Sequence, residues 1–187
     1  IEIHPQGDLP ARSGSGSSSS FSVGLINGLL ALMGESIDAH SLALKAIELE
    51  QEILKESVGS QDQMAAAHGG LNVMQFCEDG SINVEQVDLP QARIAELESH
   101  LMLIYTGTSR LSTEVASRVT ANIPNKAAVL TRMRHMVDEG VSLLQGNGSL
   151  DGFGELLHEG WTLKRSLAEG VTTSQIDEIY EAARTKG

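Results

Sequence analysis

Apolar residues recur every three or four positions over much of this chain, which is the spacing of one face of an α-helix. The first such series follows the stretch "LPARSGSGSSSSF" and predicts a helix that ends at Gly34. Its buried stripe is expected to consist of Phe21, Leu25, Leu29 and Leu32. The glycine- and serine-rich stretch therefore leads into a helix rather than into more spacer sequence.

A second helix is predicted to begin after Asp38, because aspartate caps helix N-termini well, and to be broken at residues 57–59. The expected buried stripe consists of Leu42, Ala46, Leu49 and Ile53. On this spacing the glutamates of the helix lie away from the centre of the stripe, at positions 48, 50 and 52.

Further along, the pattern alternates between strand and helix periods. A small-residue helical segment precedes two alternating runs around Asp79-Gly80, which predict a hairpin. "HLMLIYTG" predicts a buried strand, and the opening "IEIH" resembles the second half of a strand. Helices are expected over 112–122, 126–145, 150–169 and 173–186, the last capped by Thr173. This mixture predicts an α+β fold with a boundary between residues 88 and 100.

Composition narrows the classes of function. The 187 residues carry a formal net charge of −12 with a pI near 4.8, which disfavours nucleic acids and anionic membranes as partners. One cysteine excludes an internal disulfide, so a reducing compartment is expected. Because neither a membrane-spanning apolar run nor a leader pattern is visible, a cytoplasmic location is expected.

The segment from Gly14 to Ser19 has two possible interpretations on its residues alone. A glycine-rich turn before a helix can direct backbone N–H groups and the positive end of the helix dipole at a phosphate. A linker or structural turn would have the same composition. The Gly-Lys-Ser/Thr ending of a P-loop and the glycine spacing of dinucleotide-binding folds are both absent.

Two carboxylates make the phosphate interpretation more specific. Glu50 lies near the end of the second predicted helix and Asp62 follows the next turn, so both can return to one point. One could hold a divalent ion and the other could accept a proton from an attacking hydroxyl, which is what phosphoryl transfer requires. A solvated acidic helix face is the alternative for most of these glutamates.

Together these residues resemble the GHMP kinase superfamily. The stretch from Pro10 to Ser19 is similar to the family's second motif, except that Ser15 replaces the usual leucine. The resemblance implies that Gly14, Ser15, Gly16, Ser17, Ser18 and Ser19 bind the phosphates of ATP. It also implies that Ser18 and Glu50 bind Mg²⁺ and that Asp62, in "SQDQ", is the catalytic aspartate.

A closer resemblance, over nearly the whole chain, is to the branch of D-glycero-D-manno-heptose 7-phosphate kinases. It is carried by "VGSQDQMAAAHGGLN", "YTGTSRLSTEVA" and "FGELLHEGWTLKRSL". In "TGTSR", Arg110 is either a ligand of the sugar phosphate or a surface residue that pairs with Glu114. His68 is interpreted as a packing or hydrogen-bonding residue rather than a base.

The resemblance implies an ATP- and Mg²⁺-dependent kinase that phosphorylates the anomeric hydroxyl of D-glycero-D-manno-heptose 7-phosphate. The alternatives are a fucose or galactose kinase of the same superfamily, or a non-catalytic sugar-binding regulator on the same fold. Residues 1–95 would belong to the N-terminal kinase domain and residues 96–187 to the C-terminal one. The first and third family motifs are not found, so we expect a fold incomplete at both ends and inactive alone. Oligomeric state is left open.

Overall fold

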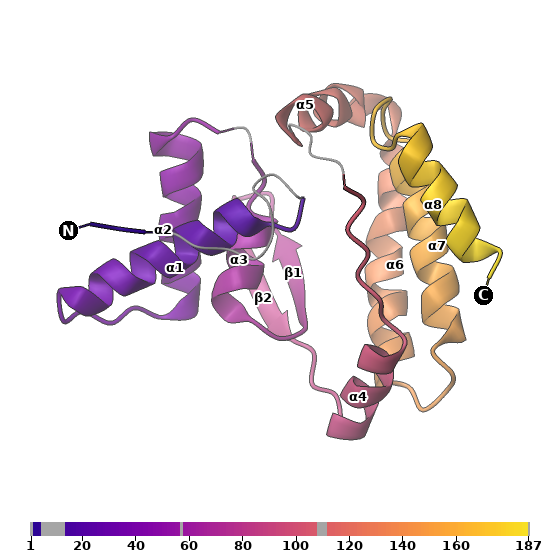
Figure 1. Cartoon of the computed structure of the whole chain (residues 1–187), viewed down its shortest axis with the longest axis horizontal. Coiled ribbons are helices and arrows are strands. Elements are labelled where there is room, and N and C mark those ends of the chain that lie inside the picture. The colour runs from indigo at the N-terminus through magenta and orange to yellow at the C-terminus, as the bar shows by residue number, and fades with distance from the viewer. Residues whose placement is uncertain (1, 5–13, 57, 108–111, 187) are drawn as a thin grey trace. The chain divides into compact units, whose positions relative to one another are not determined.

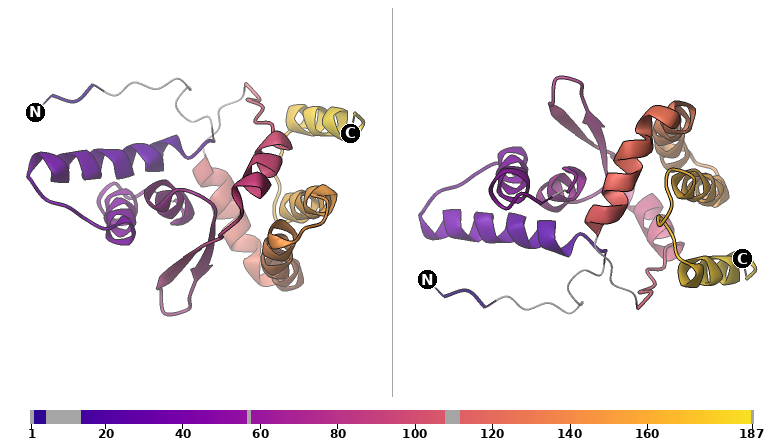
Figure 2. Two further views of the ribbon diagram at one scale, coloured as in Figure 1. Left: turned by 90° about the horizontal axis from the view of Figure 1, so that it is seen from below. Right: turned by 90° about the horizontal axis from the view of Figure 1, so that it is seen from above.

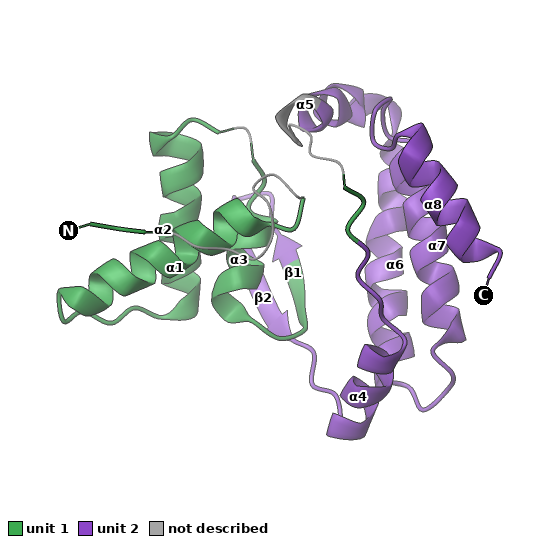
Figure 3. Ribbon diagram, viewed as in Figure 1, with its two compact units in different colours: residues 1–74, 105–113 green, residues 75–104, 114–187 purple. Residues whose placement is uncertain are grey.

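The computed structural model describes residues 2–4, 14–56, 58–107 and 112–186. The chain forms two compact units, shown in different colours in Figure 3. The first comprises residues 1–74 with 105–113, and the second comprises residues 75–104 with 114–187. The predicted division into kinase domains at residue 95 stays a prediction, because a compact unit and a domain of a longer protein need not coincide.

Three helices and a π-helical turn make up most of the first unit. They are α1 (Ser17–Leu32), α2 (Ala39–Ile47), the π-helical turn η1 (Glu48–Ile53) and α3 (Gln61–His68). The three α-helices pack against one another, as the views in Figures 1 and 2 agree. Their core is an aliphatic cluster of Val23, Leu42 and Ala46, joined by Ile26, Ile37 and Ala67.

Both predicted helices of this unit are confirmed, but the predicted stripe of the first is not, and that of the second fails at Ile53, which is 67% exposed. Asp38 caps α2 by accepting a hydrogen bond from the Ser41 backbone N–H at 2.9 Å. In α1, however, Phe21 is 47% exposed and Leu32 is 74% exposed. The buried side chains of this helix are instead Ser19, Ser22 and Val23. The inward face of α1 therefore carries hydroxyl groups, and a purely apolar criterion selects the wrong face.

The hairpin is confirmed, with strands β1 (Asn72–Phe76) and β2 (Ile82–Gln86) forming a two-stranded sheet. Its turn is fixed locally. Gly80 takes a positive φ of 85°, and Asp79 accepts hydrogen bonds from the backbone N–H and the hydroxyl of Ser81. The turn residues alone therefore account for the position of the hairpin.

Helices also dominate the second unit. They are α4 (Gln91–Ser99), most of α5 (Ser112–Asn122), the 3₁₀ turn η2 (Ile123–Asn125), α6 (Ala127–Gln145), α7 (Asp151–Arg165) and α8 (Ser174–Arg184). Helices α6 and α7 lie side by side (Figures 1 and 2). Thr173 caps α8 through the Ile176 backbone N–H, as predicted. No helix in the described ranges is both long and apolar enough to cross a bilayer.

Two predictions outside the helices are wrong. Residues 101–105 of "HLMLIYTG" form no strand, and their side chains are 48–92% exposed. A strand needs a neighbour for its backbone N–H and C=O groups, and the sheet found within the described residues contains only β1 and β2. Residues 2–4 of "IEIH" likewise form no strand. Helix α4 lies within the boundary region predicted between residues 88 and 100, where the sequence analysis expects no helix.

Candidate active site

Glu50 is a buried carboxylate on the π-helical turn η1. Its exposed fraction is 1%. The turn is marked by a hydrogen bond from the Leu54 N–H to the Leu49 carbonyl oxygen, and the Glu56 N–H reaches the carbonyl oxygen of Glu50 at 2.9 Å. A π-turn has more residues per turn than an α-helix, so it rotates the following side chains out of a 3.6-residue pattern. Glu50 itself still follows the helical period of α2, since it lies four residues after the buried Ala46 and seven after the buried Ala43. The expected stripe, drawn through Leu49 and Ile53, therefore missed the face that carries Glu50.

Three side chains from two other helices donate hydrogen bonds to this carboxylate. The Ser19 hydroxyl of α1 donates to Oε2 at 3.0 Å, and the Ser22 hydroxyl, one turn further along α1, donates to Oε1 at 2.8 Å. The Gln63 amide of α3 also donates to Oε2. Glu50 therefore joins η1, α1 and α3 at one buried point.

The electrostatics of this point are unusual for a structural contact. All three recorded partners of Glu50 are neutral, and within the described part of the chain no Lys, Arg or His forms an ion pair with it. Burying a carboxylate without a cation is costly, and hydrogen bonds offset only part of that cost. A cation supplied from outside the chain would complete the compensation.

A magnesium ion fits this chemistry. The described residues contain no group of three or more His, Cys, Asp or Glu side chains that could hold a metal. Magnesium, however, is commonly bound through one or two carboxylates together with waters and substrate phosphates. One buried carboxylate beside a serine hydroxyl is therefore a sufficient protein contribution.

Asp62 lies where the glycine-rich segment enters α1. It is exposed, in the first turn of α3. A Cβ atom built on Gly16 would lie 3.1 Å from Asp62 Oδ2 and 3.4 Å from its Cγ. Gly16 is also the N-cap of α1 and has a positive φ of 68°. Glycine is thus required here for two reasons, the backbone conformation and the close approach of the carboxylate.

Gln51 links the segment that carries Glu50 to the helix that carries Asp62. Its amide nitrogen donates to the Val58 carbonyl oxygen at 3.0 Å and to the Ser60 hydroxyl at 3.1 Å. Ser60 is the N-cap residue of α3. These two bonds hold the loop between η1 and α3 and so fix where the first turn of α3 begins.

The other described residues of the glycine-rich segment lie at the N-terminal end of α1. Gly14 has a positive φ of 76° with open space around its Cα, and Ser17 and Ser18 belong to the first turn of α1. The N-terminus of this 16-residue helix has the dipole orientation that favours an anion. Pro10 and Arg110 lie outside the described residues.

The predicted metal ligands are only partly brought together. The Ser19 hydroxyl donates a hydrogen bond to Glu50. Within the described part of the chain no hydrogen bond joins Ser18 to Glu50, and the Ser18 carbonyl oxygen accepts one from the Ser22 hydroxyl. The roles given to Ser18, Ser15 and the other loop residues stay predictions.

Sequence reasoning missed Ser22 and Gln63. Ser22 lies three residues after Ser19 and so on the same helix face, which is a signal that could have been used. Gln63 had no separate signal beside its neighbour Asp62. His68, interpreted as a packing residue, lies edge-on to His40 with ring centroids 5.9 Å apart.

Comparison with known proteins identifies what this chain is similar to. The model of the GHMP kinases N terminal domain matches residues 1–70, the range that contains the glycine-rich segment, Glu50 and Asp62. Residues 1–70 of the chain are thus similar to the N-terminal domain of the GHMP kinases, as the sequence predicted. A solved GHMP-type relative, a D-glycero-D-manno-heptose 1-phosphate kinase from Bacteroides thetaiotaomicron, superposes with a TM-score of 0.64 and 29% identity. The match covers 86% of this chain and 46% of that one, so the α+β GHMP kinase fold is confirmed.

Two curated relatives are sugar kinases. The D-glycero-alpha-D-manno-heptose 7-phosphate kinase of Campylobacter jejuni is 26% identical over the whole chain, and the bifunctional fucokinase/GDP-fucose pyrophosphorylase of Arabidopsis thaliana is 25% identical over 97% of it. This chain spans 56% of the first relative's length and 18% of the second's.

Proposed function

We propose that this chain is part of an ATP-dependent kinase that phosphorylates a hydroxyl group of a sugar or sugar phosphate. The observation that carries the proposal is the position of the Asp62 carboxylate against Gly16, at the N-terminal end of α1. A kinase of this kind needs a carboxylate beside the site where the phosphates of ATP are held. The relatives' activities support the same class of reaction.

Asp62 is assigned to the acceptor hydroxyl. An exposed carboxylate at the start of a helix can accept a hydrogen bond from that hydroxyl, orient its oxygen toward the γ-phosphate and take its proton as the new bond forms. Free aspartate has a pKa of about 3.9, so it is a weak base at neutral pH. Much of its contribution would then be orientation of the attacking oxygen in a loose transition state.

The segment from Gly14 to Ser19 is assigned to the phosphates of ATP. Its glycines let the backbone approach the oxygens, and the dipole of α1 is directed favourably for an anion. Glu50, with a hydroxyl from this segment, would hold Mg²⁺. When bound, the ion would neutralise charge on the phosphate oxygens during transfer.

The acceptor we favour is D-glycero-D-manno-heptose 7-phosphate, at its anomeric hydroxyl. The support is the relative from Campylobacter, whose match runs over the whole chain. A fucose-type acceptor is the second candidate, because the plant relative also matches over nearly the whole chain. Use of ATP is in keeping with the cytoplasmic location expected from the sequence.

The proposal is tested on the protein that carries this chain. ATP, Mg²⁺ and single sugars would be supplied, among them the heptose 7-phosphate, fucose and galactose, and release of ADP would be measured. We expect sugar-dependent ADP release, fastest with the heptose 7-phosphate, and none from the Asp62→Asn variant. Binding of sugar without any turnover would overturn the proposal and indicate a non-catalytic regulator.

A further inference from the structure

Two of the groups that hold Glu50 lie outside the loop assigned to ATP. Ser22 belongs to the second turn of α1 and Gln63 to the first turn of α3. Both are buried, and the Gln63 side chain is fully so. Neither residue is assigned to the phosphates of ATP or to the acceptor hydroxyl, so their contacts with the carboxylate require a separate explanation.

The two oxygens of Glu50 are used unequally. Oε2 accepts hydrogen bonds from Ser19 and Gln63, whereas among the described residues Oε1 accepts only the one from Ser22. A carboxylate offers about four acceptor positions, two on each oxygen. Oε2 is therefore filled by protein donors, and the remaining position is on Oε1.

We propose that Gln63 and Ser22 are positioning residues that orient Glu50 so that Oε1 binds a divalent cation through its remaining lone pair. The inference rests on the proposed function, which assigns the cation to Glu50. Neutral donors suit this task, because they fix the carboxylate without cancelling the charge that attracts the ion. A lysine or arginine at the same place would compete with the metal.

The Gln63 amide itself supports a specific role. Its other end, Oε1, is buried and has no hydrogen-bond partner among the described residues. Turning the amide over would place that oxygen against the carboxylate, so the observed orientation is the one that donates to Glu50. Buried polar atoms without partners are uncommon in proteins, and retaining one here keeps a single N–H bond to Glu50.

The alternative is that both residues only offset the free-energy cost of burying the Glu50 carboxylate in the folded state. In that case their removal would lower stability and leave the affinity for the cation unaltered. The two possibilities are separated by measuring cation-dependent binding at a temperature well below unfolding.

The experiment uses calorimetric titration with a non-hydrolysable ATP analogue at a series of Mg²⁺ concentrations, and once without Mg²⁺. In Gln63→Met, which keeps the volume and removes the donor, we expect the Mg²⁺ concentration for half-maximal enhancement of binding to rise about 10- to 100-fold. Analogue affinity without Mg²⁺ should be unaltered. Ser22→Ala, which is small and keeps the helix, should shift the same midpoint in the same direction.

Asn122→Leu is the control, since it removes a side-chain amide that donates to the Leu167 carbonyl oxygen at 2.6 Å instead of to the carboxylate. It should lower the unfolding temperature and keep the Mg²⁺ midpoint. Unchanged Mg²⁺ midpoints in folded Gln63→Met and Ser22→Ala would overturn the inference, even with a fully active wild type. If the wild type phosphorylates no sugar but the two variants still shift the Mg²⁺ midpoint, the proposed function would be overturned and the inference supported.

Discussion

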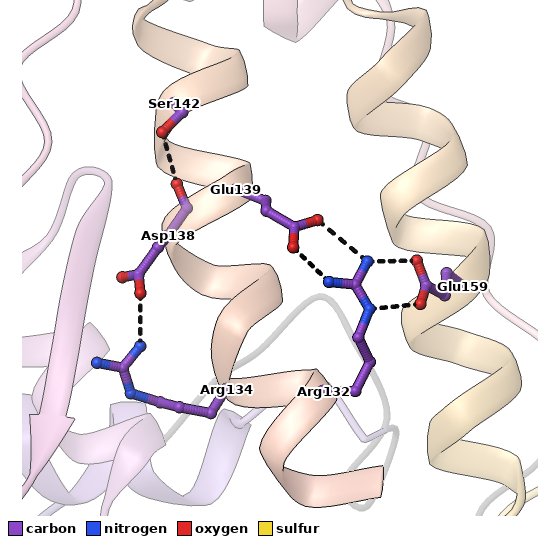
Figure 4. Close-up of polar contacts among 6 residues, drawn as sticks. All are labelled: Arg132, Arg134, Asp138, Glu139, Ser142 and Glu159. Carbon is purple, nitrogen blue, oxygen red and sulfur yellow. Dashed lines mark hydrogen bonds and ion pairs between the residues drawn. The ribbon is translucent and has the colours of Figure 1, made fainter. Parts of the chain in front are cut away.

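The first unit of this protein holds one buried carboxylate and the second holds a pair of carboxylates on one arginine, and the two sites differ in how the charge is compensated. In the second unit, Arg132 of α6 pairs with Glu159 of α7 at 2.6 and 2.7 Å and with Glu139 of its own helix (Figure 4). These three side chains are 35–45% exposed. In the first unit, Glu50 is buried and its recorded partners are neutral.

The difference separates a contact that serves the fold from one suited to a ligand. Arg132 neutralises its carboxylates inside the chain, and its hydrogen bonds lower the pKa of both Glu159 and Glu139. Arg132 and Glu159 join α6 to α7. Because solvent and salt screen such half-exposed pairs, they contribute little to the free energy of unfolding. Glu50 is instead buried without a cationic partner among the described residues, beside the N-terminal end of α1, which is a reason to bring a cation there.

The largest effect is expected from Asp62→Asn, which keeps the shape and removes the charge and the basicity. Sugar-dependent ADP release should fall by about 100- to 10,000-fold or more, the usual range for a general base. Because Asp62 is exposed, the unfolding temperature and the affinity for nucleotide should stay close to those of the wild type. A variant that keeps most of its turnover would show that the active-site carboxylate lies elsewhere.

The next largest effect is expected from Gly16→Ala. The new methyl group would sit 3.1 Å from Asp62 Oδ2 at a positive φ, so the loop or the carboxylate must move. Small displacements of reacting groups can cost about 100-fold in rate, and we expect kcat to fall by that order. Gly14→Ala is the matched control, since it shares the positive φ but meets no atom within 4 Å. Equal losses in both variants would indicate backbone strain alone.

A smaller effect should identify the serine that accompanies Glu50. The family resemblance selects Ser18, whereas the hydroxyl in contact with the carboxylate is that of Ser19. Glu50→Gln should raise the Mg²⁺ concentration needed for half-maximal activity by at least about tenfold. Ser18→Ala and Ser19→Ala are then compared with it, and the serine that shares the site should show a non-additive effect in the double variant.

The comparison also shows which features could be predicted from sequence. The starts of α2 and α8 and the turn of the hairpin follow from single residues acting on their own backbone, namely Asp38, Thr173 and Gly80. The burial of Glu50 was missed because the expected stripe followed the apolar Leu49 and Ile53, whereas the buried helix face runs through Ala43, Ala46 and Glu50. The expected strand at 101–105 failed for another reason, since strand formation depends on a partner that local sequence does not specify.

The candidate site was predicted through a family resemblance more than through residue patterns. That resemblance selected Glu50, Asp62 and the loop, and the structure places both carboxylates at the beginning of α1. It did not select Ser22 or Gln63, because a side chain that only orients another leaves no pattern of its own in one sequence. Such residues become visible only when the donors around a buried group are counted.

The smallest effect is expected in the second unit. Glu159→Gln removes one of the two carboxylates on Arg132, and half-exposed ion pairs contribute little, so the unfolding midpoint at pH 7 should fall by no more than about 2–4 °C. Asp138→Asn, which breaks a more exposed pair with Arg134 on α6 (Figure 4), is the control and should cause a smaller shift.

The pH dependence tests the same pair more sharply. Arg132 lowers the pKa of Glu159 and Glu139 in the folded state below the ordinary value of 4.5, so the unfolded chain takes up protons first as the pH falls. The stabilisation is therefore fully present above about pH 4.5 and is lost as the pH falls through the lower, folded-state pKa. Unfolding midpoints measured from pH 7 down to pH 3 should converge for the wild type and Glu159→Gln at the acidic end. A difference between them that persists undiminished at pH 3 would mean that Glu159 acts through packing rather than through its charge.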